Sequence, residues 1–337
     1  MKRRVGADIG FGRYKVVDDR GRRESGLSVI GDFQPLPSIS GVENGKYLAV
    51  EYKDRRYYVG EAALIQSTPR ATVDKRRNVS EEGLILLNTA LAVTMDEPSD
   101  HIRLVVGLPV LHYEELKTDY KNIVMGQHRI AIIAPSGKIR FDKTIIVDDA
   151  RVLPQPMGTY FNLLLDDTGQ MTAASKLYAT GKVGIIDIGY NTLDPARIDG
   201  LDFIGFRSTS FSRMGMVTAY QELANIIYQD HHVEIATEKM EAYLQQGYLS
   251  VAGKGVDLEH MKEAAFKTAA VKIASRIKSF WPDMWELDLI VLAGGGAELL
   301  GAYIKMDPEF ARAIVVPEPM FANANGYLKF AKKVWKE

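Results

Sequence analysis

The chain lacks cysteine and has no excess of charge of either sign, and both absences narrow its function. Without cysteine it cannot form a disulfide framework, a thiolate zinc site or a cysteine nucleophile. Its 337 residues carry 42 Lys and Arg against 43 Asp and Glu, a formal charge of −1. Sequence-independent nucleic-acid binding needs clustered cations, so we expect no direct contact with nucleic acid.

Long apolar runs are also missing. The most apolar long segments, such as residues 84–93, are shorter than the roughly 20 residues that a membrane-spanning helix needs. The basic N-terminus is interrupted by Asp8 and by glycines before the apolar core of a signal peptide can develop. The composition therefore predicts a cytoplasmic protein with no membrane partner, and its length favours two domains or lobes.

Two segments about half the chain apart resemble each other. Residues 5–17 are VGADIGFGRYKVV and residues 183–198 are VGIIDIGYNTLDPARI, so that DIGF at 8–11 aligns with DIGY at 187–190. Each segment has an apolar run ending in Asp, a turn with Gly, and a second run of β-forming residues. This pattern predicts a β-hairpin, in contrast to the strand–turn–helix of a dinucleotide fold. A repeat at half-length indicates two lobes of like topology, each presenting one turn to a shared cleft.

Hydrophobic spacing predicts the remaining elements. We expect buried strands at 102–110 and 287–293, and short strands within 26–60 and within 129–147, the latter with a turn at 135–137. Lobe I is assigned to residues 1–165 and 315–337, with a small subdomain at about 26–80; lobe II is assigned to 166–314, with a helical subdomain at about 215–280. Helices are expected at 80–94 behind Ser80 as N-cap, and at 112–125, 154–165, 216–230, 237–246, 258–279, 297–305 and 321–333.

The first hairpin has the residues to bind a polyphosphate. Asp8 ends a strand, and the glycines after it let backbone N–H groups approach a ligand. Lys15 on the returning strand could reach back towards a phosphate, and the acid suits a magnesium ion held through water. Taken alone, the same pattern also fits a tight turn with a surface lysine.

The second hairpin repeats the acid and the glycine and adds Asn191 and Thr192 as small hydrogen-bonding residues. Two acids at the ends of buried strands are costly to desolvate unless a cation or a water network satisfies them, and a shared Mg²⁺ would do so. Asp194 is either part of this site or a turn cap before Pro195. The proline predicts that its strand is an edge or bulges there.

A third element is the glycine run at residues 294–296, which follows a buried strand and precedes a helix. Such glycines let the backbone pass beneath a planar or bulky group, while the N-terminus of the helix favours an anion. A flexible strand–helix turn is the alternative. The order of two Asp-x-Gly hairpins followed by this run favours a nucleotide site.

This ordered set resembles that of the actin-like ATPases, the superfamily that also contains sugar kinases and the heat-shock chaperone ATPase domain. Residues 8–15 resemble its first phosphate loop, 187–194 its second and 292–299 its adenosine motif. Within the superfamily the chain is most similar to the ParM-type plasmid-segregation actins and to archaeal actin-like proteins, through VVGLPV at 105–110, VLPQPMGTY at 152–160 and FANANGYLKF at 321–330. The resemblance implies an α/β, actin-like (ribonuclease H-like) fold of two similar lobes around an interlobe nucleotide cleft.

The resemblance also implies a role for each site residue. Asp8 and Asp187 would hold the Mg²⁺–nucleotide complex, mostly through water, and Gln155 would position the hydrolytic water. An amide is not a strong base, so catalysis would rest on positioning and electrostatics; a helix-start residue between prolines is the alternative for Gln155. The second loop has one glycine where the family usually has two or three, which predicts a looser approach to the phosphates. Contacts to phosphates, adenine and ribose are expected from Gly10, Phe11, Gly12, Arg13, Lys15, Gly189, Tyr190, Asn191, Gly294, Gly295, Gly296 and Ala297.

Three functions fit this site. The first and favoured one is a filament-forming ATPase that uses ATP, or alternatively GTP, with Mg²⁺, and that segregates plasmid DNA through a small DNA-binding adaptor. The second is a small-molecule kinase, for which no sugar-kinase signature is present. The third is a nucleotide-gated module of the chaperone type, which we would expect to be followed by a peptide-binding domain. Residues 32–40 and the basic run 75–77 are candidate polymer contacts, although a charge run is usually a solvated face.

Overall fold

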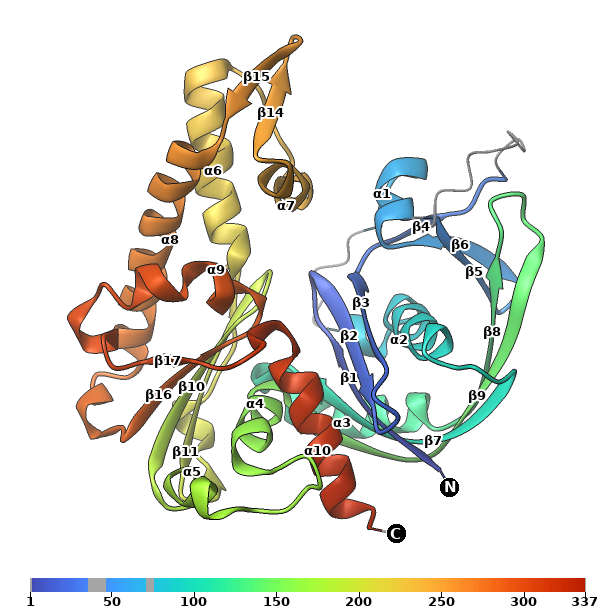
Figure 1. Cartoon of the computed structure of the whole chain (residues 1–337), viewed down its shortest axis with the longest axis horizontal. Coiled ribbons are helices and arrows are strands. Elements are labelled where there is room, and N and C mark those ends of the chain that lie inside the picture. Colours follow the sequence, from blue (N-terminus) through green and yellow to red (C-terminus); the bar gives the residue numbers. More distant parts are fainter. Residues whose placement is uncertain (1, 36–46, 71–75, 337) are drawn as a thin grey trace. The chain divides into compact units, whose positions relative to one another are not determined.

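The chain folds into two compact units, which are described separately here. In the computed structural model, residues 2–35, 47–70 and 76–336 are described. Unit 1 consists of Met1–Lys176 and Phe321–Glu337, and unit 2 of Leu177–Met320. Figure 1 labels the helices and strands of both units.

Unit 1 is built on a mixed sheet that curves around one helix, α2 (Figure 1). The strand order in the described residues is β3-β2-β1-β7-β9-β8-β5-β6-β4. The segment predicted as a small subdomain, about 26–80, supplies β4 to β6, which extend this same sheet beyond β8. The strands are β1 (Arg3–Ile9), β2 (Arg13–Asp18), β3 (Arg23–Leu27), β4 (Ile30–Asp32), β5 (Leu48–Tyr52), β6 (Arg55–Val59), β7 (Ser99–Leu108), β8 (Gly126–Ile133) and β9 (Ile139–Pro154).

Helix α2 (Glu81–Val93) forms the centre of the core of unit 1. Its N-cap is Ser80, as predicted, and the side chain of Ser80 accepts a hydrogen bond from the backbone N–H of Gly83. All residues from Gly83 to Ala92 are buried, so the helix is enclosed on every side. The other helices of this part of the chain are α1 (Glu61–Gln66), α3 (Val110–Val124), α4 (Gln155–Leu164), α10 (Ala322–Val334) and α5 (Lys176–Thr180), which begins at the boundary of the units.

Helix α10 returns to unit 1 and packs on α4 and on β1, so the prediction of a C-terminal helix on the first lobe is confirmed. The packing is close enough to require glycine. A Cβ atom at Gly6 would overlap the carbonyl oxygen of Ala324, and one at Gly326 would overlap the backbone of Gly158. The two helices and β1 are therefore in backbone contact.

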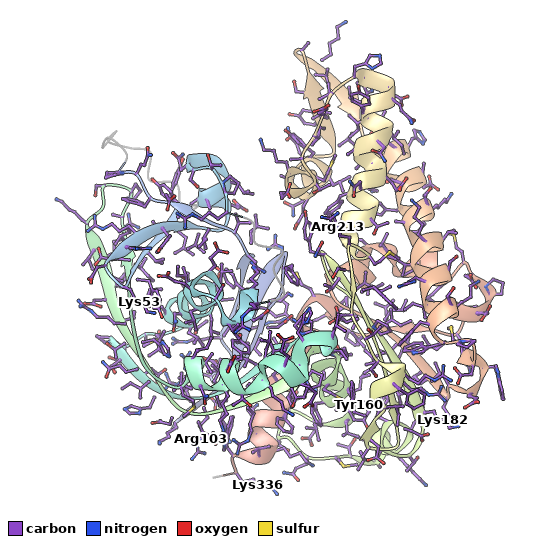
Figure 2. All side chains as sticks on the ribbon, turned by 180° about the vertical axis from the view of Figure 1, so that it is seen from behind. Lys53, Arg103, Tyr160, Lys182, Arg213 and Lys336 are labelled. Carbon is purple, nitrogen blue, oxygen red and sulfur yellow. The ribbon has the colours of Figure 1, made fainter. Side chains whose placement is uncertain are left out.

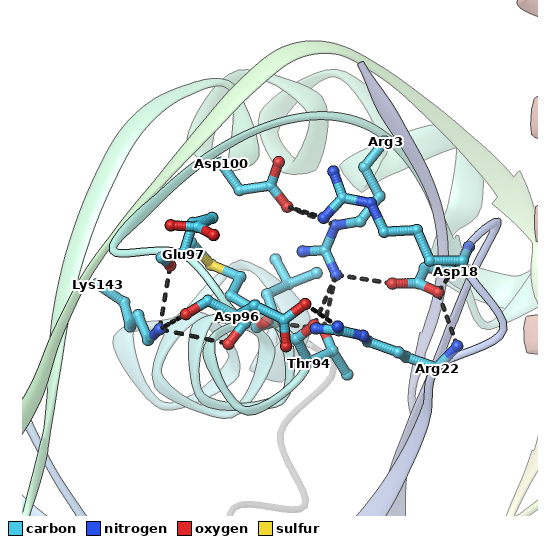
Figure 3. Close-up of polar contacts among 11 residues, drawn as sticks. Arg3, Asp18, Arg22, Thr94, Asp96, Glu97, Asp100 and Lys143 are labelled. Atoms are coloured by element: carbon cyan, nitrogen blue, oxygen red, sulfur yellow. Dashed lines mark hydrogen bonds and ion pairs between the residues drawn. The ribbon is translucent and has the colours of Figure 1, made fainter. Parts of the chain in front are cut away.

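A buried group of charged side chains joins β1 to the end of α2 (Figure 3). The Arg3 guanidinium contacts Asp18 at 2.9 Å and Asp100 at 2.7 Å, and it donates to the hydroxyl of Thr94 at 3.0 Å. Lys143 donates to the carbonyls of Met95, Asp96 and Glu97 and so holds the segment that follows α2. Removing one partner of such a buried pair costs about 3–5 kcal/mol, so the group fixes β1 in place.

Unit 2 repeats the strand path of unit 1. Its sheet has the order β12-β11-β10-β16-β17, with β13 on β11. In both units an antiparallel hairpin is followed by two parallel neighbours, because β10 and β16 pair in parallel as β1 and β7 do. The prediction of two lobes of like topology is confirmed. The strands are β10 (Lys182–Ile188), β11 (Thr192–Asp199), β12 (Asp202–Phe203), β13 (Phe211–Ser212), β16 (Leu289–Ala293) and β17 (Ile314–Val315).

The helices of unit 2 pack mainly on one another and on this sheet. α6 and α8 make the most extensive helix–helix contact of the unit, and their buried residues belong to one hydrophobic core. The helices predicted at 216–230, 237–246 and 258–279 are confirmed with small shifts at their ends. The elements are α6 (Met216–His231), α7 (Thr237–Gln246), α8 (Glu259–Phe280), α9 (Gly295–Ile304), β14 (Tyr248–Val251) and β15 (Lys254–Asp257).

The largest departure from the predicted elements lies at residues 129–147. In place of a run of short strands, the structure has β8 and the 16-residue β9, joined by the predicted turn, in which Gly137 has φ 84°. β9 is long because it pairs with β8 in its first half and with β7 to its end. Among the helices in the described ranges, none is long and apolar enough to cross a bilayer.

Candidate functional site

The first hairpin joins β1 to β2 through a two-residue loop, Phe11 and Gly12. The N–H of Gly10 donates to the carbonyl of Arg13 at 3.1 Å and closes the turn. In this register Asp8 lies directly opposite Lys15, and their side chains form an ion pair of 3.0 Å. The turn is tight, as the alternative reading also had it, but the lysine side chain is only 12% exposed and is not a surface lysine.

Gly10 leaves the space through which the lysine side chain passes. A Cβ atom at Gly10 would lie 3.0 Å from the carbonyl oxygen of Arg13 and 3.3 Å from Nζ of Lys15. Any side chain there would displace the ammonium or the turn. The glycine thus places a cation and backbone N–H groups at one end of the hairpin, which is the arrangement expected for an anion site.

Gln155 contacts the same carboxylate. It is the first residue of α4, as the alternative prediction had it, but its buried side chain also reaches Asp8: Nε2 donates to Oδ1 at 3.2 Å. The two oxygens of Asp8 thus accept from an amide and from an ammonium group. Three predicted site residues, Asp8, Lys15 and Gln155, are brought together within unit 1.

The three stretches that carry the resemblance to segregation actins meet behind Gln155. The hydroxyl of Tyr327 donates to the carbonyl of Gln155 at 3.3 Å, and a Cβ atom at Gly107 or Gly158 would overlap the tyrosine ring. Asn323 accepts from the N–H and the hydroxyl of Thr159 at 3.1 and 2.8 Å. These stretches therefore hold the start of α4, and with it the amide that contacts Asp8.

Arg77 is a site residue that the sequence analysis missed. It belongs to a short 3-10 turn, η1 (Arg77–Val79), and donates to the carbonyls of Gly10 at 2.9 Å and Ser28 at 2.5 Å. Its guanidinium lies 5.4 Å from the centre of the Phe11 ring. Burial lowers the pKa of Arg77 to about 10, so it remains a cation at neutral pH. The arginine holds the first turn in place from behind.

The prediction that residues 75–77 form a solvated face is wrong for Arg77. Lys75 lies outside the described residues, as does the end of the segment 32–40, whereas Arg76 is exposed and pairs with Asp119. Next to Arg77, the amide of Asn78 donates to the carbonyl of Ile9 at 3.2 Å. The only feature of the sequence that could have pointed to Arg77 was a basic residue before a helix cap. That pattern is common on protein surfaces.

The second hairpin has the same geometry. The N–H of Gly189 donates to the carbonyl of Thr192 at 2.9 Å, the loop is Tyr190 and Asn191, and Asp187 lies directly opposite Asp194. Asp194 is buried within β11 and accepts from the hydroxyl of Ser210, so the turn-cap alternative is wrong.

Pro195 is accommodated in a gap between two pairings on one side of β11. It pairs with Ile186 with no shift of register, and the alternation of hydrogen-bonded pairs points its nitrogen away from β10. On that side β12 and β13 leave a gap between their pairings with β11. Both predicted possibilities are wrong: β11 is flanked on both sides and has no bulge opposite β10, and the proline fits because β12 and β13 leave its nitrogen unpaired.

The start of α6 supports the second loop. The N–H groups of Met216 and Val217 donate to the carbonyls of Gly189 and Tyr190 at 2.9 and 2.8 Å. A Cβ atom at Gly215 would overlap the carbonyl of Gly189, so this glycine, which the sequence analysis did not single out, permits the contact. The Tyr190 side chain bonds to Thr237 on α7 at 3.4 Å. The loop is therefore held through its main chain by α6 and through the Tyr190 side chain by α7.

The glycine run packs against the second acid. Gly294 has φ 82°, and a Cβ atom there would overlap Oδ1 of Asp187 and the carbonyl of Ile188. Helix α9 begins at Gly295 and not at Ala297 as predicted, so Gly295 and Gly296 form its first turn. Because Gly294 and Gly296 are both fixed by contacts with Ile188, the packing argues against a merely flexible turn.

The donor groups fit a magnesium ion held through water. Among the described residues, no cluster of three or more His, Cys, Asp or Glu could enclose a metal ion directly. In unit 1, Asp8 is the acid and its oxygens already accept from Lys15 and Gln155. A hydrated cation, which needs few protein ligands, suits such a site better than a bare one.

Comparison with known families and structures agrees with this architecture. Residues 6–158 match the family described as the N-terminal domain of actin-like proteins, and residues 185–306 match the C-terminal domain of the archaeal MreB-like actin homologue. No curated protein matches the chain.

Several solved structures share the fold over nearly the whole chain. A ParM filament from Clostridium botulinum has a TM-score of 0.80 and 24% identity and covers 98% of this chain and 99% of its own. The archaeal actin homolog Ta0583 in complex with ADP has a TM-score of 0.76 and 19% identity, and the match covers 98% of this chain and 99% of that chain. Bacillus thuringiensis ParM with AMPPNP has a TM-score of 0.71 and 18% identity, and the match covers 97% of each chain. With the two family matches in this order along the sequence, the chain belongs to the actin-like proteins.

Proposed function

We propose that this actin-like protein is a filament-forming ATPase whose assembly depends on bound nucleotide. The observation that carries the proposal is the repeated hairpin. Each unit presents a buried acid, a closing glycine and a two-residue loop in the same register. Helix α9 begins with glycines beside Asp187. Together with the two hairpins it provides groups suited to binding a nucleoside triphosphate with Mg²⁺.

The chain's own residues account for binding and for positioning. The backbone N–H groups of the two loops and the ammonium of Lys15 would contact phosphates, and Gly294–Ala297 would lie against adenine and ribose. Asp8 and Asp187 would hold Mg²⁺ through water, and the ion, when bound, neutralises charge on the phosphates. ATP is the proposed nucleotide, since relatives of this fold are seen with ADP and AMPPNP.

Gln155 is the proposed positioning group for the attacking water. Its Nε2 donates to Asp8, which leaves its amide oxygen to accept a hydrogen bond from a water molecule. A neutral amide does not remove a proton, so the gain in rate would come from holding the water in line and from the charges around the phosphates. The contact of Tyr327 with the backbone of Gln155 would keep this geometry fixed.

The cellular role that we propose is segregation of plasmid or other DNA in the cytoplasm. The ParM relative from Clostridium botulinum is seen as a filament, which supports self-association of this chain. A formal charge of −1 gives little attraction to DNA, so a small DNA-binding adaptor would link the filament to its cargo.

Sedimentation and light scattering test the proposal. The protein is incubated over a wide concentration range with ATP and Mg²⁺, with ADP and Mg²⁺, and without nucleotide, while phosphate release is followed. We expect a sedimentable polymer with ATP and phosphate release that accompanies it. Phosphate release without polymer at any concentration would overturn the filament and would favour a nucleotide-gated module or a kinase.

A further inference from the structure

The second hairpin carries an aromatic residue at its tip. Tyr190 follows Gly189 directly, in a loop where the family usually has more than one glycine. A glycine offers only its backbone to its neighbours, whereas a tyrosine adds a ring and a hydroxyl group. The contacts of this side chain therefore show what the aromatic residue adds to the loop.

The Tyr190 side chain contacts both α6 and α7. Its ring faces that of Tyr220 on α6, with the ring centres 6.1 Å apart and the ring planes at 52°. Its hydroxyl donates to the hydroxyl of Thr237, the first residue of α7, at 3.4 Å. Burial raises the pKa of Tyr190 above its ordinary value of 10.0, so the hydroxyl keeps its proton at neutral pH and donates.

The main chain of the same residue is open to a ligand. Within residues 2–35, 47–70 and 76–336, the N–H groups of Tyr190 and Asn191 have no acceptor. Two successive N–H groups of this kind suit an anion such as a phosphate. Tyr190 thus has its N–H at the proposed phosphate site and its hydroxyl at the start of α7.

The main chain of the loop is attached to α6. Arg213, labelled in Figure 2, precedes this helix and has φ 57°, a left-handed conformation that is unfavourable for a residue with a Cβ atom. The turn there brings the N–H of Met214 to the carbonyl of Asn191 at 3.3 Å, next to the bonds from the first N–H groups of α6. The backbone of the loop is therefore fixed independently of α7.

α7 itself has little support. Of its ten residues, all of them described, only Met240 is buried, and Ala236 before it provides no side-chain cap for its first N–H groups. β14 and β15 follow α7 and form a separate two-stranded sheet, in which Leu249 is the buried residue (Figure 1). A helix with few buried contacts and a lone hairpin are the parts of a fold that open most easily.

We propose that Tyr190 couples nucleotide binding at the second loop to the order of α7 and of the β14–β15 hairpin. The proposal rests on the proposed nucleotide function and makes Tyr190 a positioning residue. A phosphate bound to the N–H of Tyr190 would fix the backbone of the tyrosine and so would restrict its ring and hydroxyl. The bond to Thr237 would then form at a smaller cost in conformational entropy.

The coupling has to act in both directions. If bound nucleotide orders α7, an ordered α7 strengthens nucleotide binding by the same factor. The loss of one hydrogen bond between neutral groups corresponds to a factor of about 2–10 in an equilibrium constant. Removal of the hydroxyl of Tyr190 or of Thr237 should therefore weaken nucleotide binding by about this factor, although the backbone of the loop is unchanged.

Hydrogen–deuterium exchange of residues 237–257, which contain α7, β14 and β15, tests the coupling. Each protein is measured without nucleotide and with saturating AMPPNP and Mg²⁺, at a concentration at which sedimentation shows monomer. Tyr190→Phe removes the donor and keeps the ring, and Thr237→Val removes the acceptor. Thr237→Ser, which keeps the acceptor, and Tyr228→Phe, which removes a half-exposed hydroxyl near the other end of α6, are the matched controls.

We expect AMPPNP to slow exchange of this segment at least about fivefold in the wild type and in both controls. In Tyr190→Phe and in Thr237→Val the slowing should be lost, and the Kd for AMPPNP, measured by isothermal titration calorimetry, should rise about 2–10-fold. The double variant should be no worse than either single variant, because both changes remove the same bond. A purely structural role would speed exchange equally with and without nucleotide.

The wild type separates failure of the coupling from failure of the proposed function. If AMPPNP binds but slows exchange equally in the wild type and in Tyr190→Phe, the coupling is overturned and the nucleotide function stands. Binding without any slowing in the wild type, or a loss of slowing in Thr237→Ser or Tyr228→Phe, overturns the coupling as well. A folded wild type that binds no nucleotide would refute the proposed function, and the coupling with it.

Discussion

The two hairpins share the same backbone geometry but differ in the charges that face each other across the strands. In unit 1 the position opposite Asp8 is Lys15, and the two form an ion pair. In unit 2 the position opposite Asp187 is a second acid, Asp194, which accepts from Ser210. Opposite charges across an antiparallel pair stabilise it and like charges destabilise it. The acid of the first hairpin thus faces a cation, whereas the second hairpin places two acids at the same cross-strand position.

The two loops are also supported in different ways. Side chains hold the first loop, since Arg77 and Asn78 donate to carbonyls of Gly10 and Ile9. Backbone groups hold the second loop, since the first N–H groups of α6 donate to its carbonyls and Gly215 leaves room for this contact. Substitution of a single polar side chain should therefore disturb the conformation of the first loop. The main chain of the second loop should be disturbed only by substitution of a supporting glycine or of its acids.

The largest effect is expected when the second acid is removed. Asp187→Ala should lower the rate of phosphate release by at least about a hundredfold, because the charge that we propose to hold the metal–nucleotide complex is lost without loss of core volume. Phosphate release and thermal melting are measured on the same preparation. Asp202→Ala, an exposed acid in the same unit, is the control and should behave as wild type. Unchanged phosphate release by the Asp187 variant would remove this residue from the site.

An intermediate effect is expected when the first loop loses its support. Arg77→Ala would leave the carbonyls of Gly10 and Ser28 without their donors, which should cost about 2–4 kcal/mol in the free energy of unfolding and raise the KM for ATP. Urea unfolding and steady-state kinetics measure the two effects. Arg76→Ala, the exposed neighbour, should change neither. Equal effects of the two substitutions would show that Arg77 does not position the loop.

The effects at the positions opposite the two acids should differ in sign between the hairpins. Lys15→Met removes the partner of a buried acid and should destabilise the metal-free protein, whereas Asp194→Asn relieves a like-charge pair and should stabilise it by roughly 0.5 kcal/mol. Urea unfolding in EDTA, repeated with Mg²⁺ and nucleotide, makes the comparison. The same sign in both variants would show that the charge patterns of the two hairpins are not the source of their difference.

Much of this architecture could be predicted because it depends on local signals. Asp-x-Gly at the end of an apolar run predicts a hairpin, so the place of Lys15 on the returning strand could be predicted, whereas its ion pair with Asp8 was not. The N-cap of α2 follows in the same way from a side chain near in sequence.

Features that depend on packing between distant segments could not be predicted. Arg77 stands in a basic run and is buried only because η1 lies beneath the first hairpin. Asp194 precedes a proline, as turn residues often do, yet it lies inside a strand because β12 and β13 leave room for that proline. The length of β9 depends on its pairing with β7, and the early start of α9 on the fit of two glycines against Ile188.

The backbone contact of α10 with β1 has a consequence for synthesis. Gly6 meets Ala324, so β1 is covered by a helix that is synthesised 318 residues after it (324 − 6). At roughly 5–20 residues per second, that cover arrives about 15–60 s after the strand. Residues 177–320 form a continuous segment and can fold during this interval. Unit 1 cannot be completed until α10 is made, so one face of β1 remains uncovered until then. The nascent chain thus has a period in which a chaperone could act on its N-terminal half.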